Sequence, residues 1–268
     1  MKNLIEKLKE FDKERKDALK TPEKWDDETV ATCFAPIAKY VLLDGYFLVN
    51  DKYIIDLGAI ELYYHEENGN IKDHIMYHTN EHPSKSKIYE LNNKEYPYFK
   101  IGSFNLHQSG VDVTFENDDN KEDKYRASFL IRSYRVLESE NDLNNMDIPF
   151  DSCSTHIFDD MFYEGISYDA GNKTTIEWIE FHKNGSYDEK GCPRVNVSKY
   201  RLNSKNKYEK DDRIYNSEKI ITKEDFEVAK KNADASNSYP KYFKYGTGKY
   251  YKQDMRLWQF KRNNIIEK

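Results

Sequence analysis

Two charged residues lie at the ends of apolar segments, where a buried charge is costly unless it is paired or takes part in chemistry. Glu61 follows the run Tyr53–Ile60, and Arg132 closes the run Ala127–Ile131. Both runs are short and rich in β-branched or aromatic residues, so they are predicted to be buried strands, each with its charge at one end. A carboxylate beside a guanidinium could act as a general base, and a structural salt bridge in the core is the alternative.

A second group of chemically useful residues lies shortly after Glu61. His74, His78 and His82 are spaced four residues apart, which on a helix would place all three on one face, as in metal sites. Pro83 limits the length of any helix there, and no carboxylate signature accompanies the histidines. We therefore predict no metal site and keep a histidine-dependent metallohydrolase as an alternative.

The C-terminal part of the chain interleaves basic and aromatic residues between Tyr239 and Lys252. A surface of this kind can neutralise phosphates and stack on bases, although tyrosines at strand spacing are also common in ordinary sheets. The residues predicted to contact nucleic acid are Lys241, Tyr242, Lys244, Lys249 and Lys252.

Composition narrows the class of protein. The chain has 268 residues, enough for a substantial core, and 34% of them are charged. Residues 1–193 carry a net charge of −15 and residues 194–268 one of +9, so a basic patch for a polyanion is compatible with the overall −6. Three separated cysteines and no apolar run of membrane-spanning length favour a cytoplasmic protein without membrane contact.

The elements that must position these residues begin with two helices. Apolar residues recur at helical spacing over Lys2–Leu19, before the stop signal at Pro22. Asp26 or Asp27 is predicted to cap the second helix, which would bend or break near Pro36.

Strands follow the helices. Val41–Val49 and Tyr53–Ile60 are predicted to form a hairpin that turns at Asn50–Asp51. The alternation of apolar and polar residues over Val111–Glu116 predicts a half-exposed strand. We therefore expect one α+β domain over residues 1–268, built on a curved, mostly antiparallel β-sheet flanked by helices.

In this order of elements, residues 28–138 resemble the alkyladenine (3-methyladenine) DNA glycosylase family. The resemblance is carried by a helix, a hairpin, the pair Glu61-x-Tyr63, a histidine-bearing loop, a glycine turn and the strand that ends at Arg132. It implies that Glu61 activates water, that Tyr63 stacks on a flipped base and that Arg132 helps to hold the water.

The remaining family positions are less well matched. The histidine that contacts the base would be His74 or His78, and a second pocket aromatic would fall near Leu106 or His107. The residue that holds the water would be Glu116 or Asn117. Where the family has a tyrosine that wedges into the duplex, this chain has Ser109, and residues 139–268 match poorly.

The resemblance implies a base-excision repair enzyme that hydrolyses the N-glycosidic bond of a flipped, alkylated or damaged purine, with DNA as its partner and no cofactor. Extruding a damaged or unpaired base costs least, which gives one source of selectivity. A protein that binds nucleic acid or a nucleotide on the same scaffold without cleaving it is the alternative. The sequence leaves the oligomeric state open.

Overall fold

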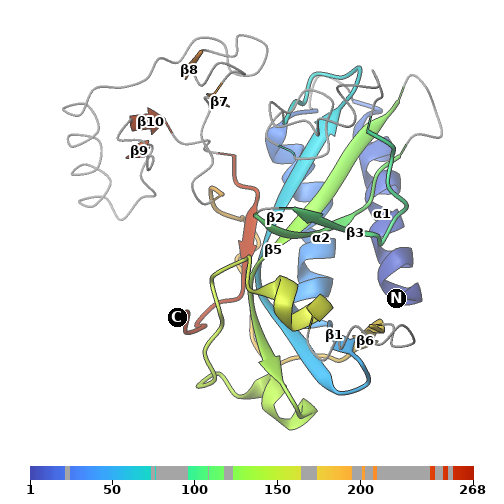
Figure 1. Cartoon of the computed structure of the whole chain (residues 1–268). Coiled ribbons are helices and arrows are strands. Elements are labelled where there is room, and N and C mark those ends of the chain that lie inside the picture. Colours follow the sequence, from blue (N-terminus) through green and yellow to red (C-terminus); the bar gives the residue numbers. More distant parts are fainter. Residues whose placement is uncertain are drawn as a thin grey trace. The chain divides into compact units, whose positions relative to one another are not determined.

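The computed structural model describes residues 1–21, 25–73, 76, 96–107, 109–117, 123–163, 174–194, 201–202, 208–209, 242–244, 250–252 and 256–268. The chain divides into two compact units. Unit 1 comprises residues 1–71, 97–191 and 258–268, and unit 2 comprises residues 72–96 and 192–257. The long helices and the main sheet belong to unit 1 (Figure 1). The single domain expected over residues 1–268 stays a prediction.

Helix α1 (Lys2–Ala18) packs through one stripe, as its periodicity predicts. Its buried residues, spaced three or four apart, are Leu4, Leu8, Phe11 and Arg15. This spacing places them on the same side of a helix of 3.6 residues per turn, so that side faces the core.

Helix α2 (Asp27–Leu43) begins as predicted and ends later than expected. Asp26 is its N-cap, and its carboxylate accepts a hydrogen bond of 2.8 Å from the backbone N–H of Thr29. Pro36 lies inside the helix, which continues beyond it to Leu43. The predicted strand start at Val41 is therefore wrong, because the apolar residues 41–43 complete the buried face of the helix instead.

Over the residues that the structure describes, the main sheet has seven antiparallel strands and curls into a half-barrel (Figure 1). Six strands run in the order β3-β4-β5-β2-β1-β6, and β11 pairs with β2 outside this path. Their bounds are β1 (Gly45–Val49), β2 (Tyr53–Glu66), β3 (Phe104–His107), β4 (Gly110–Thr114), β5 (Tyr125–Leu137), β6 (Ile176–Glu180) and β11 (Gln259–Lys261). The mixed α+β class and the antiparallel sheet are confirmed, while the likeness to a glycosylase fold stays a prediction.

Two local features shape the long central strand β2. It is joined to β1 at Asn50 and Asp51, both with positive φ angles near 55°, which matches the tight hairpin turn predicted there. The register between β2 and β5 then shifts at Gly58, where a side chain would meet the Phe150 ring at 2.5 Å. The glycine therefore allows Phe150 to pack against the strand where the sheet bends.

The two faces of the central strands differ in chemistry. One face carries apolar residues such as Leu62, Val113 and Phe129, which join the helices in a single core. The other, here called the polar face, comprises Glu61, Tyr63, His65, Asp112, Thr114, Glu116, Arg126, Ser128 and Gln259. All of these except the half-buried Tyr63 are buried, so the expected half-exposure of residues 111–116 is wrong: their polar side is covered as well.

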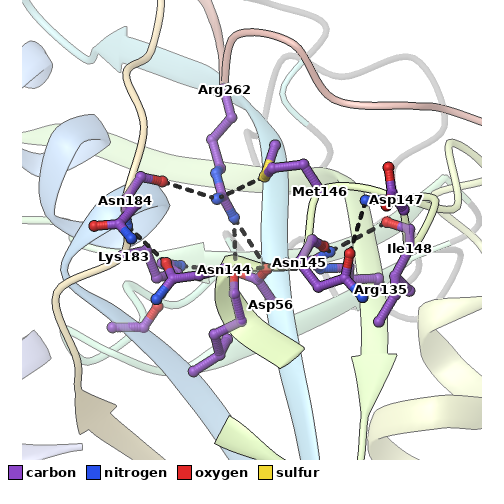
Figure 2. A network of polar contacts seen from close by, with 12 residues as sticks. Asp56, Arg135, Asn144, Asn145, Met146, Asp147, Ile148, Lys183, Asn184 and Arg262 are labelled. Carbon is purple, nitrogen blue, oxygen red and sulfur yellow. Dashed lines mark hydrogen bonds and ion pairs between the residues drawn. The ribbon is translucent and has the colours of Figure 1, made fainter. Parts of the chain in front are cut away.

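A second buried group of charges lies in unit 1 around a single carboxylate (Figure 2). Asp56 accepts hydrogen bonds from Arg135 at 2.9 Å, Lys183 at 2.8 Å and Arg262 at 3.0 Å. All four side chains are at most 2% exposed. The contacts tie β2 to β5, to the segment after β6 and to the C-terminal segment, which are distant in sequence.

The described part of unit 2 contains short antiparallel pairs. Strand β7 (Arg201–Leu202) pairs with β8 (Tyr208–Glu209), and β9 (Tyr242–Lys244) pairs with β10 (Tyr250–Lys252). Buried Asp73 binds Arg194 at 2.6 Å and Arg256 at 3.2 Å, which joins distant parts of this unit. Within the described residues, no helix is long and apolar enough to span a bilayer.

Candidate functional site

Glu61 occupies the middle of the polar face rather than a strand end. Strand β2 continues five residues beyond it to Glu66, and Arg132 likewise lies inside β5. The predicted strand-end positions are therefore wrong, because polar residues such as His65 continue the ladder with β5. Glu61 is only 1% exposed and lies between its cross-strand partners Leu130 and Gln259.

Among the described residues, three different chemical groups hold the Glu61 carboxylate. The Tyr63 hydroxyl donates to Oε2 at 3.0 Å, and the Gln259 amide donates to Oε1 at 3.3 Å. The Arg132 Nε atom lies 3.8 Å from Oε1, beyond hydrogen-bonding distance but within reach of an ion pair. Glu61, Tyr63 and Arg132 therefore meet in one cluster.

Arg132 connects this cluster to a neighbouring loop. Its Nη1 group donates to the Ser154 hydroxyl at 3.2 Å, and that hydroxyl donates to the Ser109 carbonyl at 2.7 Å. Gly110, with a φ of 135°, allows the close approach, since a side chain there would come within 2.7 Å of the Ser154 carbonyl. The turn at Ser109, where the sequence led us to expect a wedge position, thus supports Arg132 through Ser154.

The same turn holds His107 against a second carboxylate. The Ser109 backbone N–H donates to Nδ1 of His107 at 3.2 Å, and Nε2 lies 3.2 Å from Oδ2 of Asp112. Nδ1 thus serves as an acceptor, and Nε2 faces the Asp112 carboxylate. His107 therefore reaches the polar face through Asp112 rather than through Glu61.

The two alternatives for a water-holding residue occupy different places. Glu116 accepts from the Phe99 backbone N–H at 2.7 Å and lies 3.5 Å from Arg126, farther along the polar face than Asp112. The Asn117 amide instead donates to Asp12 of α1 at 3.0 Å. Asn117 is thus turned toward the helix side of the sheet, away from Glu61, and its predicted role has no support from this geometry.

Several predicted site residues are outside the described part. These are His74, His78, His82, Lys241 and Lys249. Tyr242, Lys244 and Lys252 lie on the β9–β10 pair, where Lys252 is opposite Tyr242. Among the residues that the structure describes, no group of three His, Cys, Asp or Glu side chains is arranged to hold a metal.

The sequence-based prediction missed three residues that lie in this cluster or near it on the polar face. Gln259 lies 198 positions from Glu61 in the sequence, and no periodic pattern predicts that the two residues are in contact. Ser154 belongs to a polar loop without a recognisable motif. Asp112 is part of the alternating pattern of β4, which could have been interpreted as a second buried face.

Comparison of the chain with family models, with curated proteins and with solved structures found no match. Function must therefore be argued from the polar face itself.

Proposed function

We propose that the protein hydrolyses the N-glycosidic bond of a damaged purine in nucleic acid, with Glu61 as the general base. The observation that carries the proposal is the position of Glu61, a nearly unexposed carboxylate held by Tyr63, Gln259 and Arg132 in the centre of a polar face. Buried charges are costly, and they concentrate where chemistry uses them.

The reaction distributes its roles over the cluster. Glu61 accepts a proton from water as the water oxygen bonds to C1′ of the sugar, and the electrons of the broken C–N bond leave with the base. An alkylated purine is already a good leaving group, so a base and a positioned water suffice and no cofactor is required. Arg132 orients the water beside Glu61, and the Tyr63 ring offers a face to an electron-poor base.

The base can reach this cluster only when the polar face is uncovered, because Glu61 and Leu130 are 1% and 3% exposed. Opening of this kind favours substrates whose base already leaves its stack easily. We place the reaction in the cytoplasm, where thiols stay reduced; the three cysteines are free, and Cys153 is exposed.

The direct test is release of free base by the native protein. Single- and double-stranded oligonucleotides would each carry one 3-methyladenine, 7-methylguanine, hypoxanthine or 1,N6-ethenoadenine, and the released base would be identified by chromatography. We expect release, faster from single strands, because Ser109 replaces the wedge residue. Release of none of the four bases would refute the proposed hydrolysis.

A binding protein without catalytic activity is the second candidate. It is favoured by the engagement of both Glu61 oxygens, by Tyr63 and by Gln259, which leaves the carboxylate less available for water. Selective binding of a damaged oligonucleotide without release of base would select this candidate.

Replacement of Tyr63 by alanine should weaken binding to the damaged site about 10- to 100-fold, because stacking on a base is worth roughly 1–3 kcal/mol. Tyr63→Phe is the matched control: it keeps the ring and removes only the hydroxyl that donates to Glu61. The measurement is equilibrium binding of a lesion-bearing single strand. Equal affinities for the alanine and phenylalanine variants would show that the ring makes no contact with the base.

Binding should also weaken steeply with salt if the basic C-terminal residues contact phosphates. Changing Lys241, Lys244, Lys249 and Lys252 together to glutamine should flatten the dependence of log K on log salt, by roughly 0.7 for each phosphate of a single strand that is no longer neutralised. The matched control changes four exposed lysines of α1, namely Lys2, Lys9, Lys13 and Lys16. An equal slope for the C-terminal variant and the native protein would assign these lysines to another role.

A further inference from the structure

The polar face carries a second carboxylate in the same row as Glu61. Leu130 of β5 is paired with Glu61 on one side and with Asp112 of β4 on the other. Residues directly opposite one another on antiparallel strands point to the same face, so all three side chains share it. Two strand spacings separate the two acidic residues, which places their backbones about 10 Å apart.

Asp112 is buried with part of its hydrogen-bonding capacity unused. The residue is 3% exposed, and Oδ2 faces Nε2 of His107. Its Oδ1 atom has no hydrogen-bond partner in the described structure. The buried Ser128 hydroxyl, opposite Tyr63 in the adjacent row, is also without one among the described residues.

Unsatisfied buried polar atoms are rare in folded proteins, and each costs free energy that a ligand can recover. Oδ2 of Asp112 faces the His107 ring, so Oδ1 is the carboxylate oxygen left to accept a hydrogen bond from a ligand. A carboxylate offers acceptors only, so its natural partner is an N–H group.

We propose that Asp112 is the specificity-determining residue of this site and that Oδ1 accepts a hydrogen bond from an N–H group on the edge of the bound base. The inference rests on the proposed function in taking a nucleobase as the ligand. A purine lying over Leu130 would have its sugar bond beside Glu61 and its far edge toward Asp112. The Ser128 hydroxyl lies in the neighbouring row and serves as a second contact.

This arrangement selects among damaged bases by chemistry. 7-Methylguanine presents a ring N–H and an amino group on that edge, whereas the corresponding nitrogens of 1,N6-ethenoadenine are enclosed in the etheno ring and donate nothing. A site built around an acceptor rejects an analogue that lacks the donor, because its buried oxygen then stays unpaired. The site should therefore prefer 7-methylguanine.

The experiment measures binding, not cleavage. The Glu61→Gln protein is titrated with single strands that carry one 7-methylguanine, one 1,N6-ethenoadenine or no lesion. We expect 7-methylguanine to bind about 10- to 100-fold more tightly than ethenoadenine. Adding Asp112→Asn should remove at least about tenfold of this preference, whereas Asp159→Asn, which changes an exposed carboxylate, should keep it.

The preference for 7-methylguanine over ethenoadenine is measured first in the protein that keeps Asp112. The inference can therefore be tested even if the Asp112 variant folds poorly. Equal binding of both lesions, or an equal loss for both in the Asp112 variant, would assign Asp112 to structure alone. An Asp112-dependent preference in a protein that releases no base would refute the proposed hydrolysis while keeping the inference. If base release is equally fast with and without the Asp112 substitution, the proposed hydrolysis stands and the role of Asp112 in specificity is refuted.

Discussion

Glu61→Gln should lower the rate of base release by about 10²- to 10⁴-fold, the range that a positioned general base contributes. Glutamine preserves the size of the side chain and an acceptor for the Tyr63 hydroxyl, which donates to Glu61 at 3.0 Å. What it lacks is the ability to take a proton from water. Binding of a lesion-bearing strand should therefore survive while cleavage is slowed by this factor.

The measurement is single-turnover release of 7-methylguanine from a single strand, with protein in excess so that the chemical step is observed. Glu138→Gln is the matched control, because Glu138 is exposed directly after β5 and its replacement removes the same charge far from Glu61. A Glu61→Gln protein that releases base at the native rate would show that Glu61 is a core carboxylate with a structural role.

Local patterns were enough to predict much of the frame around Glu61. The stripe of α1, the cap at Asp26 and the turn at Asn50–Asp51 depend on neighbouring residues, so the sequence carries their signals directly. The end of α2 was missed because residues 41–43 are apolar and suit a helix or a strand equally. Tertiary packing on the sheet decided between them.

The site was only partly predictable for a related reason. Glu61 and Arg132 interrupt apolar runs, and this local contrast identified them as buried charges. Nothing local distinguishes a polar residue that faces water from one that faces covered sheet, so Asp112 was interpreted as exposed. Gln259 reaches Glu61 through the pairing of β11 with β2, which is a long-range choice of the fold.

The Asp56 network shows the same limit most clearly. Its four members are spread from residue 56 to residue 262, and each alone resembles an ordinary surface charge. Only the sheet and the segments around it bring three cations to one carboxylate (Figure 2). This arrangement makes Asp56 a residue whose replacement should strongly affect stability.

Asp56→Asn should lower the free energy of unfolding of unit 1 by about 3–5 kcal/mol, the cost of breaking a buried ion pair on one side. Asparagine fits the space but leaves Arg135, Lys183 and Arg262 buried together without a countercharge. A domain is typically stable by only about 5–15 kcal/mol, so this decrease is a large fraction.

The measurement is denaturant unfolding followed by tryptophan fluorescence. The three tryptophans, Trp25, Trp178 and Trp258, all belong to unit 1, so the signal reports the unit that contains the network. Asp147→Asn is the matched control, because Asp147 is exposed in a loop beside the network and its replacement should change stability by less than about 0.5 kcal/mol.

The loss of stability caused by Asp56→Asn, here called the deficit, should also depend on pH. It is the difference in unfolding free energy between the native protein and the variant. Burial lowers the pKa of Lys183 from its usual 10.5 to about 8, against the opposing effect of Asp56. Without the carboxylate this pKa falls further, so the folded variant releases the proton at a pH where the native protein still binds it. Linkage then requires the difference in unfolding free energy between the two proteins to shrink as pH rises toward 8.

Unfolding curves of both proteins at about pH 6 and about pH 8 test this sign, since Lys183 stays protonated in both unfolded chains over that range. A deficit that grows with pH would mean that Lys183 is not the group that adjusts to the missing charge. A deficit below about 1 kcal/mol at both values would mean that the backbone carbonyls around Arg135 and Lys183 already stabilise the cations without Asp56.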